Sequence, residues 1–278
     1  MLTRRQLNLM PVIDPRRPYN ALPHLPPTAT IETIEVLRAL NSASRALADL
    51  NGATLSVPNP NLLVDTFGIK EAQATSEIEG VRTTSDRLFR FMAIGNRQAT
   101  DATKEAARSQ LALASGIRHL RQNPHLNTAM LVGLCSQILG NQVDIRDEGA
   151  HIEDSLSGAI IYTPPFGQNL ILRLLDNLLQ FVAAAEPNWD PLIKMAILHY
   201  QFEAIHPFPD GNGRTGRVMN VLYLMQQRLL DYPVLYLSRF FVENLGEYYE
   251  GLKAVTEKSD WEQWILYILR AIREVASD

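Results

Sequence analysis

The segment that most constrains the fold is residues 192–204, where apolar side chains fall on nearly every face of a helix. It follows Asp190-Pro191. Aspartate is a good helix N-cap, and proline fits the first helical turn. A helix that is apolar on all sides has to be buried at the centre of a bundle. The sequence therefore predicts a helical domain assembled around this segment.

Helical periodicity recurs on both sides of the central segment, so the predicted fold class is all-α. The other segments expected to be helical are 31–50, 62–78, 101–120, 127–139, 168–185, 215–230, 240–255 and 261–275. In the first of these, the apolar stripe is expected to comprise Ile31, Ile34, Leu37, Leu40 and Leu47.

One short β-hairpin is expected near residues 152–163. Gly158 interrupts the chain there, Ile160 and Ile161 are β-branched, and Pro164-Pro165 ends the segment. Residues 1–28 contain six prolines, which disfavour helix, so this stretch is expected to be an extended arm on the surface.

Composition narrows the class of protein further. The 278 residues suit one large domain, or one domain with a smaller partner, and the net charge of −4 argues against general nucleic-acid binding. The single cysteine, Cys135, has apolar neighbours and is expected to be buried. One cysteine allows no disulfide framework, which fits a cytoplasmic protein. No apolar stretch approaches the roughly 20 residues that cross a bilayer, so no membrane partner is expected.

The residues that carry the chemistry follow the central helix, in the segment His206-Pro-Phe-Pro-Asp-Gly-Asn-Gly-Arg-Thr-Gly-Arg217. Gly211 and Gly213 flank Asn212 and permit positive φ, which turns backbone N–H groups inward. The helix that follows adds a partial positive charge at its N-terminus. Together these features predict a cradle for phosphate oxygens.

Charged side chains complete the pattern. Arg214 and Arg217 are three residues apart, so they share a helix face and can point at one anion. Asp210 could hold Mg²⁺ beside the phosphates, and His206 could act as a base near neutral pH. Singly, each feature also fits an ordinary turn, a helix cap or a solvated arginine. Their joint occurrence favours a nucleotide site.

Two common phosphate-binding motifs do not explain this segment. Gly211-Asn-Gly213-Arg-Thr-Gly216 fits Gly-x-Gly-x-x-Gly, but that fingerprint must follow a strand, and here a helix and a His-Pro loop precede it. No Walker-type Gly-Lys-Ser/Thr element is present. A Rossmann interpretation is therefore rejected.

Residues 206–217 match the signature of the Fic family, His-Pro-Phe-x-Asp-Gly-Asn-Gly-Arg-x-x-Arg, at every fixed position. Leu25-Pro26-Pro27 is similar to the family's N-terminal region, and residues 247–252 with 261–264 are similar to its C-terminal part. The resemblance implies a Fic-type helical bundle. It would have an N-terminal region at 1–100, and a catalytic core at 101–278 with a flap at about 150–165.

The resemblance also implies an activity: a protein adenylyltransferase that moves AMP from ATP to a Tyr, Thr or Ser hydroxyl of a target protein. His206 would be the catalytic base, and Asp210 would hold Mg²⁺. The nucleotide-binding residues would be Gly211, Asn212, Gly213, Arg214, Thr215, Gly216, Arg217, Tyr248 and Tyr249. Those of the target-binding flap would be Ile160, Ile161 and Tyr162. Taken alone, aromatic residues such as Tyr248 and Tyr249 on a helix are more often core. A kinase-like branch of the family carries lysine where this chain has Gly213, so the glycine favours transfer of the whole nucleotide.

A second motif lies upstream, at Thr75-Ser-Glu-Ile-Glu79-Gly80. Alone it is a helix C-terminus with Gly80 as cap. It also matches the family's inhibitory motif, Ser/Thr-x-x-x-Glu-Gly/Asn. The resemblance implies that Glu79 pairs with Arg217 where the γ-phosphate would bind.

Three functions remain open on the sequence: AMP transfer, nucleotide sensing without turnover, and removal of AMP with Glu79 positioning a water. Self-modification is expected in vitro, and a homodimer is compatible with the sequence.

Overall fold

The computed structural model describes residues 13–94, 99–153 and 158–278. The start of the arm (1–12), the end of the predicted N-terminal region (95–98) and the middle of the predicted hairpin (154–157) lie outside the described residues. Eleven helices occur in the described part: α2 (Ile34–Leu55), α3 (Pro60–Ile78), α4 (Ser85–Ile94), α5 (Asp101–Gln122), α6 (Thr128–Leu139), α7 (Gln168–Ala183), α8 (Pro191–Ile205), α9 (Asn212–Gln226), α10 (Leu237–Glu243), α11 (Leu245–Lys258) and α12 (Trp261–Ser277).

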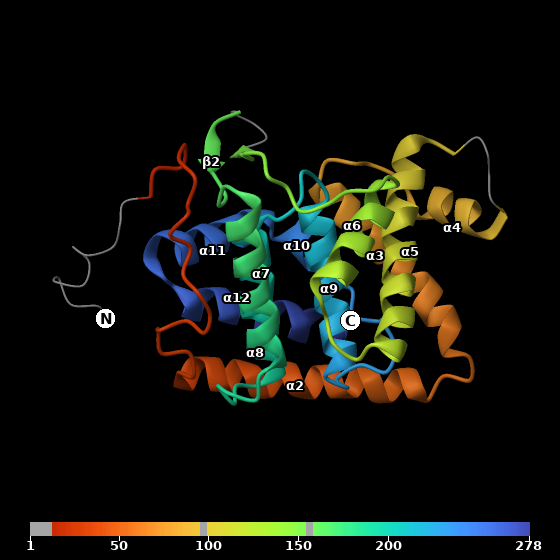
Figure 1. Ribbon diagram of the computed structural model, residues 1–278. Coiled ribbons are helices and arrows are strands. Elements are labelled where there is room, and N and C mark those ends of the chain that lie inside the picture. The colour runs from red at the N-terminus through yellow and green to blue at the C-terminus, as the bar shows by residue number, and fades with distance from the viewer. Residues whose placement is uncertain (1–12, 95–98, 154–157) are drawn as a thin grey trace.

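Helix α8 is the central element of the bundle (Figure 1), as its sequence predicts. Every residue from Leu192 to Ile205 except Glu203 is buried. Two of the buried polar side chains on α8 bond to backbone carbonyls: Lys194 Nζ donates to Ala184 O over 2.8 Å, and Gln201 Nε2 donates to Pro23 O over 2.9 Å. A helix that is buried on nearly all sides and held by such bonds is a rigid support for whatever follows its C-terminus.

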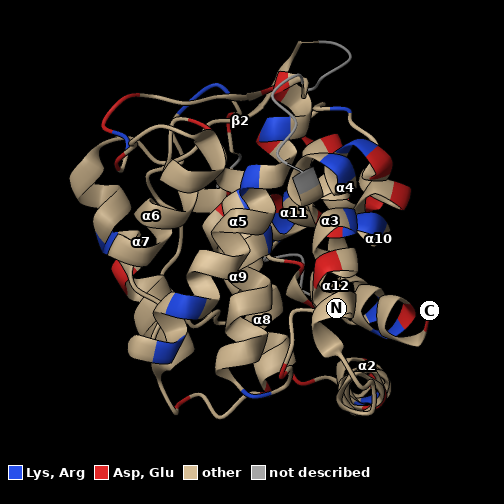
Figure 2. Ribbon diagram, turned by 90° about the vertical axis from the view of Figure 1, so that its right-hand side faces the viewer, with Lys and Arg blue, Asp and Glu red and all other residues tan. Residues whose placement is uncertain are grey.

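The first and the last helix of the described residues pack together. Helix α2 runs along one side and packs against α12 (Figures 1 and 2). Figure 2 also shows acidic and basic residues interspersed along α4 and α10. Within the described residues, no helix combines the length and apolarity that crossing a membrane requires.

The only sheet in the described residues is the predicted hairpin. Strands β1 (Ile152–Glu153) and β2 (Ile160–Tyr162) pair antiparallel, with Ile152 opposite Tyr162. We refer to residues 149–164 as the flap.

The N-terminal arm forms no helix or strand in residues 13–33, but it contains turns and is partly buried against the bundle. Leu22 and Leu25 are buried, and Leu25 exchanges two backbone hydrogen bonds with the Asn177 side chain of α7. The arm also holds the flap, because Tyr19 N donates to Thr163 O over 2.9 Å and Thr163 Oγ1 donates to Pro15 O over 2.6 Å.

Three local expectations are wrong. The predicted helix 240–255 is two helices, because Asn244 ends α10 by donating its backbone N and side-chain Nδ2 to Phe240 O. Helix α4 was not expected at all. In α2 the buried face comprises Val36, Ala43 and Leu47, whereas Ile34 is 63% exposed.

Candidate functional site

The loop after α8 is fixed at both ends by the sequence of its motif. His206 closes α8 in a left-handed conformation, with φ 50° and ψ 60°, and its N–H donates to Phe202 O over 3.0 Å. Phe208 is fully buried and secures the loop in the core. The Asn212 side chain then closes the loop, because its Oδ1 accepts from Phe208 N and its Nδ2 donates to Phe208 O, both over 2.8 Å.

This closure moves the start of the next helix. Helix α9 begins at Asn212 and not at the predicted Thr215, so Gly213, Thr215 and Gly216 all lie in its first turns. Only Gly211, of the two glycines around Asn212, has a positive φ (76°). The first turn of a helix leaves backbone N–H groups without helical acceptors, and these suit an anion. Asn212 therefore shapes the cradle with its side chain instead of offering that side chain to a ligand.

The first motif arginine is held by two carboxylates. Arg214 is buried and pairs with Glu105 of α5, and its Nη2 lies 3.6 Å from Asp210 Oδ1. The Asp210 side chain is 71% exposed, and its Oδ1 also accepts from Gly211 N over 2.5 Å. Glu105 belongs to no recognisable sequence motif, so the sequence did not predict its role. It fixes Arg214 from outside the segment 206–217.

The second motif arginine contacts the upstream motif, as the resemblance implies. Arg217 Nη2 donates to Glu79 Oε1 over 2.7 Å, and Arg217 Nε donates to Thr75 Oγ1 over 2.6 Å. Burial works to raise the pKa of Glu79, but the charges of Arg217, Arg214 and His206 hold it below its ordinary value. The Arg217 side chain is 3% exposed and that of Glu79 is 34% exposed, so the pair closes one end of an open site.

The end of α3 places Glu79. Val81 N donates to Ser76 O over 2.9 Å and Gly80 N donates to Glu77 O over 3.0 Å, with Gly80 at φ 79°. These two bonds form a Schellman helix end with glycine in its left-handed position. The helix end thereby holds the Glu79 carboxylate beside Arg217.

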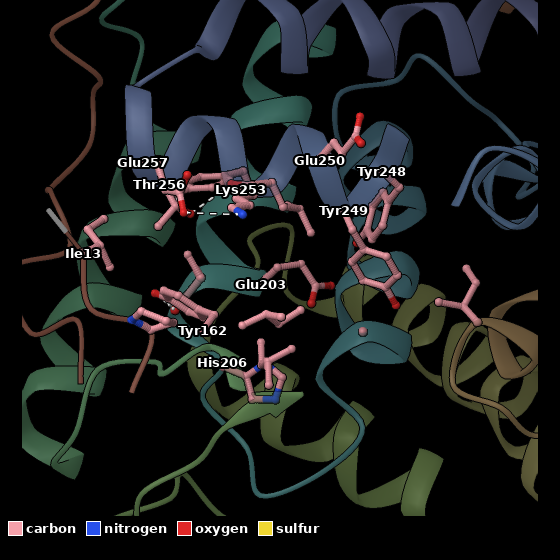
Figure 3. A pocket seen from close by; sticks show the side chains of 18 of the residues that line it. Ile13, Tyr162, Glu203, His206, Tyr248, Tyr249, Glu250, Lys253, Thr256 and Glu257 are labelled. Atoms are coloured by element: carbon pink, nitrogen blue, oxygen red, sulfur yellow. Dashed lines mark hydrogen bonds and ion pairs between the residues drawn. The ribbon is translucent and has the colours of Figure 1, made fainter. Parts of the chain in front are cut away.

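A cavity of about 340 Å³ connects the two motifs. Its walls include Glu79, Gly213, Arg217, Lys253 and Thr256. Figure 3 shows His206 and Glu203 across this cavity from Tyr248 and Tyr249.

His206 and Glu203 titrate far from their ordinary ranges. Burial and the nearby charge of Arg146 lower the pKa of His206 to about 4. The imidazole is therefore neutral at pH 7, and its Nδ1 is buried without a hydrogen-bond partner among the described residues. Burial raises the pKa of Glu203 to about 7, against the charge of Arg217. Glu203 was also missed by sequence reasoning, because a glutamate on an otherwise buried helix has no recognisable pattern.

The two tyrosines of α11 differ in what they can contact. Tyr248 is 2% exposed, and its hydroxyl lies 3.0 Å from His199 Nε2 inside an aromatic cluster with Phe241 and Trp264. Tyr249 is 42% exposed and presents its ring to the cavity. Tyr248 is mainly a core residue whose surface reaches the cavity wall, whereas Tyr249 is free to meet a ligand.

The flap residues lie at the rim of the same cavity. Ile161 is 44% exposed, whereas Ile160 and Tyr162 are half-buried. Tyr162 donates its hydroxyl to Ala204 O over 2.9 Å, which ties the flap to the end of α8. Ile161 and Tyr162 line the cavity, so the flap sits beside His206.

The fold and site together define a helical protein in which the first turn of α9 and His206 line one cavity. Residues 37–118 match the Fic/DOC family N-terminal region, and residues 125–224 match the Fic/DOC family. Together these matches span more than half of the chain, and the chain belongs to the Fic/DOC family.

Curated relatives are similar over part of the chain. A probable protein adenylyltransferase of Aquifex aeolicus is 38% identical over 96 residues, which are 34% of this chain and 28% of that protein. A protein adenylyltransferase of Caenorhabditis briggsae is 30% identical over 109 residues, 39% of this chain and 20% of that protein. The chain thus matches less than a third of the length of either relative.

The fold is also that of a Fic family protein from Desulfovibrio desulfuricans. The two structures share a TM-score of 0.74 at 22% identity, over 91% of this chain and 75% of the other.

Proposed function

We propose that this chain is a protein adenylyltransferase that transfers AMP from ATP to a Tyr, Thr or Ser hydroxyl of a target protein, and that Glu79 holds this activity low. The observation that carries the proposal is that neutral His206 and the N-terminal turn of α9 share one cavity of about 340 Å³. A cavity of this size suits a small ligand, and a helix N-terminus beside arginines suits phosphates. The names of the relatives support the same chemistry.

The reaction needs a base and charge neutralisation more than covalent catalysis. His206 would accept the proton of the target hydroxyl, whose oxygen would form a bond to the α-phosphorus of ATP. The bond from that phosphorus to the bridging oxygen would break, and pyrophosphate would leave. The N–H groups at the start of α9, with Arg214, would stabilise charge on the phosphate oxygens.

Asp210 fits a magnesium ligand in this scheme. Its side chain is mostly exposed beside the cradle, and Mg²⁺ is often held by one carboxylate together with substrate phosphates. The described residues contain no cluster of three or more metal-binding side chains, so the ion would share its ligands with the nucleotide. When bound, Mg²⁺ would neutralise charge on the phosphates.

The inhibition follows from competition for one guanidinium. Arg217 would bind the γ-phosphate, but in this structure it donates to Glu79 and Thr75. An arginine held by a carboxylate in a buried, directional pair cannot offer the same donors to a phosphate. ATP would therefore enter with its α-phosphate poorly aligned, and such misplacement can cost about 10²-fold in rate.

The experiment is to follow α-labelled ATP with the Glu79→Gly variant in a cell lysate and alone. Label on protein supports the proposal. Label that is released as AMP from a previously labelled protein would favour the reverse direction. ATP binding without turnover would favour a nucleotide sensor, and the proposal would then be wrong.

A further inference from the structure

Arg146 lies in the loop between α6 and β1, and its buried guanidinium donates to four backbone carbonyls of the described residues. Nε donates to His206 O over 2.6 Å, and Nη2 donates to Ile205 O over 3.2 Å. The backbone N of Arg146 donates to Pro207 O over 3.0 Å. One residue thus contacts three consecutive carbonyls at the end of α8. Among the described residues, no carboxylate lies within ion-pair distance of this arginine.

The same guanidinium holds both ends of the flap. Nη1 donates to Glu148 O over 2.8 Å, just before the flap begins. Nη2 donates to Pro165 O over 2.7 Å, just after the flap ends. The planar fork of an arginine sets the directions of these bonds, so the flap base and the end of α8 are fixed relative to each other.

The end of α8 needs such a partner. The last carbonyls of a helix have no helical donors, and a cation there is favourable. His206 also adopts a left-handed conformation, which costs a non-glycine residue about 1 kcal/mol or more. The bonds from Arg146 satisfy the carbonyls of Ile205 and His206 and thereby hold that conformation.

We propose that Arg146 is a positioning residue that holds His206 and both ends of the flap in one arrangement, so that a hydroxyl presented at the flap meets the base. This inference rests on the proposed function, in which His206 is the base. The residue acts through backbone carbonyls and does not touch the nucleotide. Its charge supports the same role, because Arg146 helps to keep the imidazole neutral.

The alternative is that Arg146 merely stabilises the fold. A loss of folded molecules would lower labelling only in proportion to the loss of ATP-binding sites at each pH, so the rate per binding site would stay the same. Loss of the positioning bonds together with the charge would lower it more at acid pH, where His206 becomes protonated. The charged groups around His206 are Arg146, Glu79 and Asp210. A ratio of rates at two pH values therefore separates the two roles.

The test uses the Glu79→Gly chain as parent and compares Arg146→Met with Arg146→Lys. The readout is self-labelling from α-labelled ATP at pH 7.5 and about pH 5.5, with the amount of bound ATP as a measure of intact sites. Arg108→Met is the matched control, because Arg108 donates to Leu139 O at the end of α6 over 2.7 Å.

We expect Arg146→Met to bind ATP normally and to label about 10²-fold more slowly at pH 7.5, with a further loss at pH 5.5. Arg146→Lys should keep the parent's ratio of labelling rates at the two pH values, since it keeps the charge. It should recover less than about a tenth of the parent rate, since a lysine cannot form the forked set of hydrogen bonds. Arg108→Met should label like the parent.

Two results would overturn the inference. The first is labelling by Arg146→Met within about twofold of the parent. The second is a decrease in labelling that matches the loss of ATP-binding sites, with an unchanged ratio of labelling rates at the two pH values. If the Glu79→Gly parent itself labels nothing while it binds ATP, the proposed function fails, and the positioning role fails with it.

Discussion

The carboxylate of Glu79 lies against the α-carbon of Gly213, so closely that a methyl group on this glycine would overlap Oε1. The same methyl group would lie 2.9 Å from Arg217 Nη1. The Glu79–Arg217 pair and the first turn of α9 therefore occupy one confined space.

Gly213→Ala should destabilise the parent chain more than it destabilises the Glu79→Gly variant, because in the latter the overlapping carboxylate is absent. Overpacking of this kind typically costs about 1–3 kcal/mol. Thermal unfolding of the four proteins gives the coupling between the two positions. Equal decreases in stability in both backgrounds would contradict the close approach of Glu79 to Gly213.

Gly213→Lys should reduce AMP transfer, since its side chain would fill the space that the phosphates need.

Glu79→Gly should raise self-labelling from α-labelled ATP clearly, on the order of 10²-fold, with little change in thermal stability. Glu77→Gly is the matched control, because Glu77 is exposed and also lies in the last turn of α3. Arg217→Ala breaks the same pair but should stay inactive, since the γ-phosphate then lacks its partner. Activation by the control variant would show that a loosened helix end is the cause.

Thr75→Val should release the inhibition only in part. It removes the hydroxyl that accepts from Arg217 Nε but leaves the Glu79 carboxylate in place. Labelling should rise less than in Glu79→Gly, and the double variant should label no faster than Glu79→Gly alone. A fall in labelling in both backgrounds would assign Thr75 to the active arrangement instead.

His206→Ala, made in the Glu79→Gly background, should lower transfer by about 10²–10⁴-fold and leave ATP binding nearly unchanged. Because the pKa of His206 is lowered to about 4, the parent rate should stay flat from pH 8 to near pH 5 and fall below that. The pH dependence of initial labelling rates measures this. A rate that halves near pH 6.5 would mean that the histidine titrates as if exposed.

Glu203→Gln should stabilise the protein above pH 7 and change little at pH 4.5. The pKa of Glu203 is raised to about 7 in the folded state, so this carboxyl takes up a proton on folding between its unfolded pKa and 7. Stability from this group is therefore lost as the pH rises through that window, by on the order of 2 kcal/mol. The test is to measure the unfolding midpoints of the parent and of Glu203→Gln at several pH values between 4.5 and 8. A difference between the two midpoints that does not change with pH would contradict the raised pKa of Glu203.

Much of the site could be predicted because its determinants are local. The run from Asp190 to Arg217 specifies a buried helix, its end, a turn and a second helix within one stretch of chain. The hairpin was predictable for the same reason, since Gly158 and Pro164-Pro165 delimit it.

The elements that were missed depend on distant partners. Ala43 of α2 is fully buried where α2 packs on α12, whereas the bulkier Leu37 is 44% exposed. Hydrophobicity alone therefore placed Leu47 correctly on the buried face but wrongly added Ile34 and Leu37 to it. Arg146 has partners at residues 148, 165, 205 and 206, all of them backbone carbonyls. Every residue has a backbone carbonyl, so the type of the partner residue does not reveal such a bond in the sequence.

The bonds that Thr163 forms with Pro15 and Tyr19 make the flap dependent on a segment that precedes every helix of the described residues. A protease that cleaved the arm after Asn20 would leave the eleven helices in place. Such cleaved protein would keep its circular dichroism spectrum and most of its thermal stability. Its flap, however, would have lost its hydrogen bonds to Pro15 and Tyr19. Batches of apparently well-folded protein would then differ in the proposed AMP transfer, and mass spectrometry of the first thirty residues would reveal the cause.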